Sequence, residues 1–311
     1  MKKILILIAI LGIILSGCSP NNESFKSLFS GKDLINWEMP GEIPGFKVSG
    51  GIIIAEPPDG SDLFTEKQYG NFIFKFEYLL SKVGNSGVLI RCDPEDPWGT
   101  GVEVQLLAPW TPYRDDLHCT GSIYGYVAVT NRPDETTGIW HKMEIKCDRK
   151  NMTISVDGQV TTVANIDTVE SMKDKHLEGT IGFQSNHSEK GEFAHFRNIS
   201  IRDMDANPEY VMKGFYEGDV RVRKQAHKAA ETMGTPMIEL LAQMLAEENP
   251  VIQTGAKQVL FDITAQSTAS EVPKSKKEDV IKALKKSLKN CSSERVSGYL
   301  SWLLKMAKSS V

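Results

Sequence analysis

The chain has 311 residues, of which 41% are hydrophobic and 24% are charged, and its formal net charge is -4. The acidic excess lies in residues 1–212, and nothing in that part suits nucleic acid, which requires a concentrated basic face, so we expect no nucleic-acid partner. A chain of this length can bury an ordinary hydrophobic core and does not need a disulfide framework.

The first segment has the parts of a secretory signal. Lys2-Lys3 precede an apolar run over residues 4–15, which is too short to span a bilayer as a stable helix. The tetrad Leu-Ser-Gly-Cys that ends at Cys18 resembles a bacterial lipobox. It predicts a signal peptide over residues 1–17, lipid attachment at Cys18 and a polar tether over residues 18–24. The protein would then be anchored by its lipid to a membrane of the bacterial cell envelope; the alternative is an uncleaved anchor helix.

Short runs of alternating polar and apolar residues extend from Phe25 to Asp203. They are typical of β-strands, which send successive side chains to opposite faces of a sheet. Asp157-Gly158, between two such runs, is the strongest hairpin signal. Many short strands with long connections predict an antiparallel β-sandwich of two sheets over residues 25–203, in preference to a closed barrel. The clearest runs are Phe72–Tyr78, Lys142–Cys147, Met152–Val156 and His195–Ile201.

The most distinctive part of this region is residues 85–126, where polar and ionisable side chains alternate with apolar ones. Glu103 and Gln105 are expected on one face of a strand, and the apolar residues at 102, 104 and 106 on the other. A strand face covered by water alone does not need Asn, Arg, Glu, Gln, His and Tyr together. We therefore interpret this stretch as the floor of a small-molecule site.

After Asp203 the apolar residues recur at intervals of three and four, which is typical of amphipathic helices. Segments that begin at Asp219 and Asn249 are similar to each other, and Ser293 opens a weaker third copy. They resemble HEAT-like units, with a plain helical bundle as the alternative. Residues 211–311 are thus predicted to form a small all-α domain that is a candidate for binding a protein partner. The expected helices cover residues 211–234, 236–248, 251–266, 277–290 and 296–308.

Taken in order, the motifs of residues 25–203 resemble a large bacterial family of β-sandwich domains described as 3-keto-disaccharide hydrolases, or 3-keto-glycoside lyases and hydratases. The resemblance implies a concanavalin-like jelly roll whose concave sheet binds sugars. The motifs that carry it are Phe25-Lys-Ser-Leu-Phe-Ser-Gly-Lys-Asp33 with Trp37, Leu63-Phe-Thr65, Asn85-Ser-Gly87, Glu103-Val-Gln105, His118-Cys-Thr-Gly121, Gly138-Ile-Trp140, Gly179-Thr-Ile-Gly182 and Phe196-Arg-Asn-Ile199.

The family chemistry implies a sugar that an upstream sugar 3-dehydrogenase has already oxidised to a ketone at C3. A base removes the acidified C2 proton, the enolate expels the C1 substituent by β-elimination, and later addition of water completes a net hydrolysis. This path needs one positioned base and a group that holds the enolate oxygen. It does not need the paired carboxylates of an ordinary glycosidase.

Glu103 and His118 are the leading candidates for the base or for ligands of a divalent metal ion, and Tyr124 is a candidate proton donor. The alternatives are an ion pair between Glu103 and Arg91, and a purely structural role for His118. Aromatic residues in the long connections, at Trp98, Trp110 and Tyr113, either stack on a sugar or pack their loops. The candidate substrate-binding residues are Asn85, Arg91, Gln105, Trp110, Tyr126 and His187.

Two other functions fit the same sequence. The sandwich can be a non-catalytic, lectin-like carbohydrate-binding module, because a fold alone does not fix a function. Alternatively, the helical region docks a partner and the sandwich serves as its platform.

Overall fold

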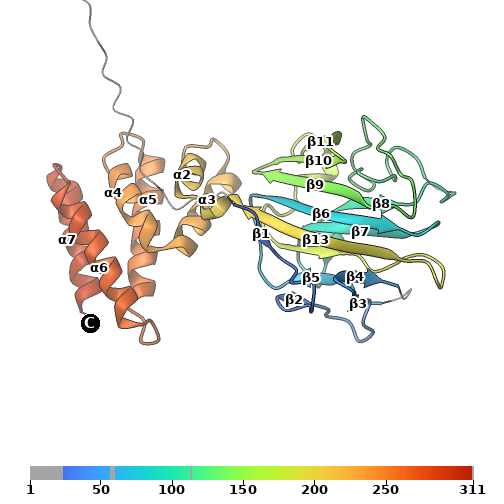
Figure 1. Ribbon diagram of the computed structural model, residues 1–311. Helices are drawn as coiled ribbons and strands as arrows, with labels where there is room; N and C mark the ends of the chain where they lie inside the picture. Colours follow the sequence, from blue (N-terminus) through green and yellow to red (C-terminus); the bar gives the residue numbers. More distant parts are fainter. Residues whose placement is uncertain (1–23, 57–59, 113, 310–311) are drawn as a thin grey trace, which may run out of the picture.

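The computed structural model describes residues 24–56, 60–112 and 114–309. A two-sheet sandwich forms one side of the molecule and a helical region the other (Figure 1). The predicted signal peptide, Cys18 and all of the predicted tether except Ser24 lie outside the described residues. Within the described part of the chain, no helix has the length and apolar character needed to cross a membrane.

The larger sheet has the strand order β11-β10-β9-β6-β13-β4-β3, and β1 also pairs with β13. All of its strand pairs are antiparallel, as the sequence predicts. Its strands are β1 (Lys26–Ser27), β3 (Phe46–Ser49), β4 (Ile52–Ala55), β6 (Phe72–Leu80), β9 (His141–Asp148), β10 (Asn151–Val156), β11 (Gln159–Asn165) and β13 (Ala194–Asp203).

The smaller sheet has the order β2-β5-β12-β7-β8 and is also antiparallel throughout. A short helix, α1 (Pro97–Thr100), connects its last two strands, and a 3₁₀ helix, η1 (Glu170–Met172), precedes β12. Its strands are β2 (Trp37–Glu38), β5 (Leu63–Thr65), β7 (Asn85–Cys92), β8 (Val102–Leu107) and β12 (Thr180–Phe183). The predicted two-sheet sandwich is confirmed.

The predicted hairpin at Asp157-Gly158 joins β10 to β11. Both residues have positive φ, 49° for Asp157 and 83° for Gly158, which is the conformation that a two-residue type I′ turn requires. This turn has the twist of the flanking strands, so it fixes their register, with Val156 opposite Gln159.

An aromatic cluster fills the space between the sheets. Phe183 of β12 lies at its centre, because its ring is 4.2 Å from that of Phe196 and 5.3 Å from that of Phe76, both in the larger sheet. Trp37 stacks on it from β2 at 5.7 Å. Phe183, Phe76 and Phe196 are at most 2% exposed. These contacts join the two layers, because the rings come from opposite sheets.

The helical region begins directly after β13 with the 3₁₀ helix η2 (Met204–Ala206). The predicted helix over residues 211–234 is in fact two helices, because Gly218 interrupts it and Asp219 accepts hydrogen bonds from the first amides of the second helix. The other elements are α2 (Pro208–Phe215), α3 (Val220–Met233), η3 (Thr235–Met237), α4 (Ile238–Met244), α5 (Pro250–Ser267), α6 (Lys274–Lys289) and α7 (Glu294–Lys308).

The three similar segments of the sequence all mark helix starts. Asp219, Asn249 and Ser293 are the N-cap residues of α3, α5 and α7, and each side chain accepts a backbone N–H of the first turn. The recurrence thus has a structural cause in capping. The HEAT-like label remains a prediction.

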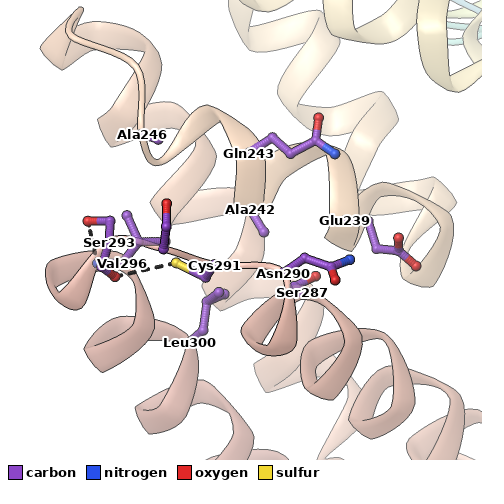
Figure 2. A pocket seen from close by; sticks show the side chains of 11 residues that line it. Glu239, Ala242, Gln243, Ala246, Ser287, Asn290, Cys291, Ser293, Val296 and Leu300 are labelled. Atoms are coloured by element: carbon purple, nitrogen blue, oxygen red, sulfur yellow. Dashed lines mark hydrogen bonds between the residues drawn. The ribbon is translucent and has the colours of Figure 1, made fainter.

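A hollow of about 280 Å³ lies between α4 and the turn that joins α6 to α7 (Figure 2). Glu239 and Gln243 line it from α4, and Cys291 lines it from the turn. The Cys291 thiol lies 3.4 Å from the backbone oxygen of Ser293. A protein partner for these helices remains a prediction.

Phe183→Ala should reduce the free energy of unfolding by about 3–5 kcal/mol, because it leaves a cavity between the two sheets. Val163→Ala on β11 is the control, since Val163 is 63% exposed and its truncation should cost less than about 0.5 kcal/mol. Chemical denaturation followed by circular dichroism measures both. Equal losses in the two variants would contradict the central place of Phe183 in the core.

Candidate active site

The side chains of β8 alternate between the two faces of the smaller sheet, as the sequence predicts. Val102, Val104 and Leu106 are part of the core between the sheets. Glu103 and Gln105 lie on the outer face of the smaller sheet, yet they are only 5% and 2% exposed. The predicted arrangement of this strand is confirmed, and it sets a carboxylate and an amide side by side under a cover of loops.

Gly87 provides the space for the Glu103 side chain. In the pairing of β7 with β8, Gly87 lies opposite Gln105. Leu89, two residues farther along β7, lies opposite Glu103. A methyl group at Gly87 would overlap Glu103 Oε1 and lie 2.8 Å from Cγ and Cδ. The carboxylate therefore lies directly over the backbone of β7, where only glycine leaves room.

Trp98 supplies a hydrogen bond to this carboxylate. Helix α1 carries it, and the Asp96 side chain caps that helix by accepting the amide of Gly99 at 3.1 Å. The indole Nε1 of Trp98 donates to Glu103 Oε2 at 3.3 Å, while 48% of the Trp98 residue is exposed. An aromatic surface thus lies between solvent and the buried carboxylate.

Burial raises the pKa of Glu103 from 4.5 to about 7. The Trp98 N–H opposes this rise by stabilising the charged form, and the negative charge of Asp62 adds to it. Asp62 is itself buried, which raises its own pKa, and it accepts the amide of Ser185 at 2.7 Å. Glu103 can therefore exchange a proton near neutral pH, as a general base requires.

The connection after β8 contributes the next groups. Ile123 pairs with Val104, and the amide of Tyr124 donates to the carbonyl of Glu103 at 2.9 Å. This pairing extends the sheet beyond β8, so Tyr124 lies on the same face as Glu103. The ring centre of His118 lies 4.8 Å from that of Tyr124, edge to face. Tyr124 is thus brought next to Glu103, and His118 lies against the ring of Tyr124.

His118 is oriented by Asp115. Its Nδ1 lies 2.7 Å from Asp115 Oδ1, which also accepts the backbone amides of Leu117 and His118. The hydrogen bond from His118 lowers the pKa of the Asp115 carboxyl, which therefore stays charged. A neutral His118 donates through Nδ1, so its Nε2 remains an acceptor.

Asn85 and the backbone of His187 lie beyond Gln105. Gln105 Nε2 donates to Asn85 Oδ1 at 3.4 Å, and the amide of His187 donates to the carbonyl of Asn85 at 2.9 Å. His187 is exposed, and its positive charge lowers the pKa of Asp62. Gln105 and Asn85 therefore form a pair of amide side chains on the face that carries Glu103, and the backbone of His187 adjoins this pair.

Arg91 does not belong to this group, which corrects the prediction. A bulge in the pairing of β7 with β12 and a φ of 55° break the alternation at Arg91. Its side chain is 2% exposed, and it donates to the carbonyls of Gly70 at 2.8 Å and Arg149 at 2.7 Å. Arg91 is thus bound to backbone near the helical region, and the expected contact with Glu103 is not formed.

The remaining candidates differ in their surroundings. Trp110 is 68% exposed in a turn beyond β8. Tyr126 packs against the sandwich core, with its ring centre 5.1 Å from Lys175 Nζ. Their roles in substrate binding remain predictions, and Tyr113 lies outside the described residues.

Two neighbours of Glu103, Trp98 and Asp62, and one neighbour of His118, Asp115, were missed or misjudged from the sequence. Trp98 was expected to stack or to pack its loop, and its hydrogen bond to Glu103 has no sequence signature. Asp62 lies before β5, far from Glu103 along the chain. Asp115 was detectable, because an aspartate three residues before a histidine often binds the intervening turn.

A metal ion needs more ligands than this arrangement offers. Among the described residues, no group of three or more His, Cys, Asp or Glu side chains is placed to hold one. A divalent metal ion held by Glu103 and His118, with Gln105 as a further oxygen ligand, stays a prediction.

A family model described as a 3-keto-alpha-glucoside-1,2-lyase-like domain matches residues 24–202. The chain belongs to this family. The match covers the sandwich of the lyase-like domain and ends just before the helical region. No curated protein matches the chain.

Two solved structures support the fold of the lyase-like domain. Both are provisionally assigned glycosyl hydrolases from Parabacteroides distasonis. The first is 24% identical, with a TM-score of 0.51, and covers 60% of this chain and 97% of its own. The second is 23% identical, with a TM-score of 0.52, and covers 58% of this chain and 99% of its own. At this level of identity the likeness shows the fold alone.

Glu103→Gln should make the stability of the protein less dependent on pH. Since the pKa of Glu103 is about 7 in the folded chain and 4.5 in an unfolded one, the unfolded state loses this proton first as the pH rises. The free energy of unfolding of the parent protein therefore falls between about pH 4.5 and about pH 7, by at most about 3 kcal/mol. Thermal unfolding should show the Tm of the variant rising relative to that of the parent as the pH is raised through this window.

Glu38→Gln is the matched control, because Glu38 is exposed and lies on the same sheet, at β2. Its Tm should stay close to that of the parent, because the side chain is exposed. A Tm difference between Glu103→Gln and the parent that does not change with pH would show that the Glu103 carboxyl is well solvated.

Proposed function

We propose that the lyase-like domain cleaves 3-keto-glycosides, with Glu103 as the base that removes the C2 proton. The supporting observation is a carboxylate that is 5% exposed and has a pKa raised to about 7. A base of this strength is half ionised near neutral pH, and burial makes it more reactive than a solvated carboxylate.

The proposed reaction needs one base, Glu103, and one proton donor to the departing oxygen. Glu103 takes the proton from C2, and the electrons of the C2–H bond form the enolate of the C3 ketone. The ketone is restored as the C1–C2 double bond forms and the C1–O bond breaks. The departing oxygen takes a proton and leaves as the alcohol or sugar, and Glu103 is left protonated. Addition of water across the new double bond gives the free 3-keto sugar.

Tyr124 is our candidate for the proton donor to the departing oxygen. Tyr124 lies opposite Glu103 on the same face of the extended sheet. Its residue is 36% exposed, so a substrate can reach it. His118 touches its ring and is fixed in turn by Asp115. His118 thus orients Tyr124, or takes its place as the proton donor.

The neutral side chains suit the rest of a sugar. Gln105 and Asn85 offer amide donors and acceptors to hydroxyl groups and to the C3 oxygen, where an N–H donor stabilises the developing enolate. Trp98 presents an exposed ring above Glu103, and such rings stack on the apolar face of a pyranose. Trp110 offers a second exposed ring farther along the chain.

The remaining expectations concern the surroundings of the enzyme. The substrate must come from a reaction that oxidises a sugar at C3, for which a dehydrogenase is the pathway partner we propose. We also propose that Cys18 is lipidated and anchors the protein to the cell envelope. Incorporation of a tagged fatty acid into the parent protein and not into Cys18→Ser tests this point.

Purified protein should release free 3-keto sugar from a 3-keto-disaccharide, and Glu103→Gln should lower kcat by about 10²-fold or more. Glu38→Gln should keep parental activity, because its side chain is exposed on β2. Binding of the disaccharide should remain measurable by calorimetry in Glu103→Gln. The assay is run with and without a chelator.

The outcomes separate the candidate functions. Full turnover by Glu103→Gln would reassign the base. Binding without turnover in the parent protein would favour the lectin-like alternative.

The pH dependence gives an independent prediction. Because Glu103 must be ionised to act as a base, kcat/KM should rise with pH up to an apparent pKa of about 7 and then level off. Initial rates between about pH 5 and about pH 9 measure this limb. Activity that falls through this range would instead require a protonated Glu103, acting as an acid.

A further inference from the structure

Residues 173–178 connect η1 to β12 and touch α1. Lys175 in this segment is only 7% exposed. Its Nζ donates to the backbone carbonyl of Trp98 and, at 3.2 Å, to that of Gly99, both in α1. It also lies 5.1 Å from the ring centre of Tyr126. A buried ammonium group is costly unless its hydrogen bonds are satisfied, so these carbonyls account for its position.

A second bond joins the same two segments. The amide of His176 donates to the carbonyl of Thr100, at the end of α1, at 2.8 Å. The end of α1 is therefore held from one side by consecutive residues of the connection before β12. The position of α1 depends on where this connection lies.

Helix α3 of the helical region holds the connection from its other side. The α3 side chains that contact this connection recur at positions i, i+4 and i+7, so they lie on one face of the helix. Val222, next to this face, is part of the sandwich core. Arg221 donates to the carbonyls of Lys173 and, at 2.6 Å, of Lys175; Gln225 Nε2 donates to the carbonyl of Leu177 at 2.6 Å; and Lys228 pairs with Glu178 at 2.9 Å.

The contacts thus run without a break from α3 to the candidate base. Arg221 binds the carbonyl of Lys175, Lys175 Nζ binds the carbonyl of Trp98, and the Trp98 indole binds Glu103 Oε2. We propose that Lys175 is a positioning residue, through which the helical region holds Trp98 against Glu103. This inference rests on the proposed function for its kinetic consequence, whereas the positioning itself can be measured without substrate.

Removing the ammonium group has a defined effect. The carbonyls of Trp98 and Gly99 lose their donor, so α1 can shift and carry the indole away from Glu103. The Trp98 N–H favours the charged form of Glu103, while burial and the charge of Asp62 oppose it. Loss of the indole removes this hydrogen bond and also admits water to the carboxylate, so the indole N–H stops reporting the ionisation of Glu103.

Lys175→Met is the decisive variant, and Lys173→Met is its matched control. Lys173 lies in the same segment, its backbone carbonyl accepts Arg221, and its side chain is 45% exposed and paired with Glu170. Both variants are made in the full chain. The readout is the indole N–H resonance of Trp98 in ¹⁵N-labelled protein without substrate, assigned by its absence in Trp98→Phe and followed as a function of pH.

In the parent protein this resonance should titrate with Glu103. Lys175→Met should reduce the amplitude of this titration to about half or less, because the indole has left the carboxylate. Lys173→Met should leave it unchanged, and Lys175→Arg, which can still donate to the two carbonyls, should restore it in part. With substrate, kcat/KM should fall in Lys175→Met and stay parental in Lys173→Met.

An unchanged titration amplitude of the Trp98 resonance in folded Lys175→Met would overturn the proposal. If Lys175→Met does not fold, Arg221→Met and Gln225→Met decide, because they cut the chain of contacts from α3; parental amplitudes in both would overturn it equally. Absence of turnover in the parent protein bears on the proposed function alone, since the resonance reports the position of Trp98 without substrate.

Discussion

The site depends on a constraint in β8, where each residue must face either the core or the outer side of the smaller sheet. Val102, Val104 and Leu106 fill the space between the sheets, and this packing leaves no freedom for the residues between them. Glu103 and Gln105 must therefore lie on the outer face. A shift of the strand by one residue would bury the carboxylate in the aromatic core, so the stability of the sandwich itself keeps the candidate base in place.

The second constraint is electrostatic. A buried carboxylate is stabilised most by a nearby cation, yet the groups that act on Glu103 are a neutral indole and the negative charge of Asp62. This environment costs stability when Glu103 is ionised, and it keeps the carboxyl able to take up a proton near neutral pH. Arg91, which could have paired with Glu103 and lowered its pKa, is bound instead to the carbonyls of Gly70 and Arg149.

Local patterns in the sequence were sufficient to predict much of this structure. The strand alternation placed Glu103 and Gln105 correctly, Asp157-Gly158 indicated the hairpin, and the recurring polar residues at 219, 249 and 293 proved to be helix caps. Arg91 was placed wrongly because a bulge breaks the alternation, and a bulge depends on the partner strand.

The contacts that complete the site could not be predicted from the sequence, for a similar reason. The bond from Lys175 to Trp98 joins residues 77 positions apart, and the bond from Arg221 to Lys175 joins the helical region to the sandwich. No short pattern encodes such contacts, because they arise from how distant segments pack. The helical region, which the sequence presented as a separate unit, is thus in contact with the segment that supports Trp98.

The central claim is that Glu103 faces C2 of a bound 3-keto sugar. A crystal structure of Glu103→Gln with an intact 3-keto-disaccharide tests it most directly. The account predicts that the side-chain amide introduced at position 103 lies about 3–3.5 Å from C2, with the glycosidic oxygen turned toward Tyr124 or His118. A disaccharide bound on another face of the protein, or with C2 turned away from position 103, would contradict it.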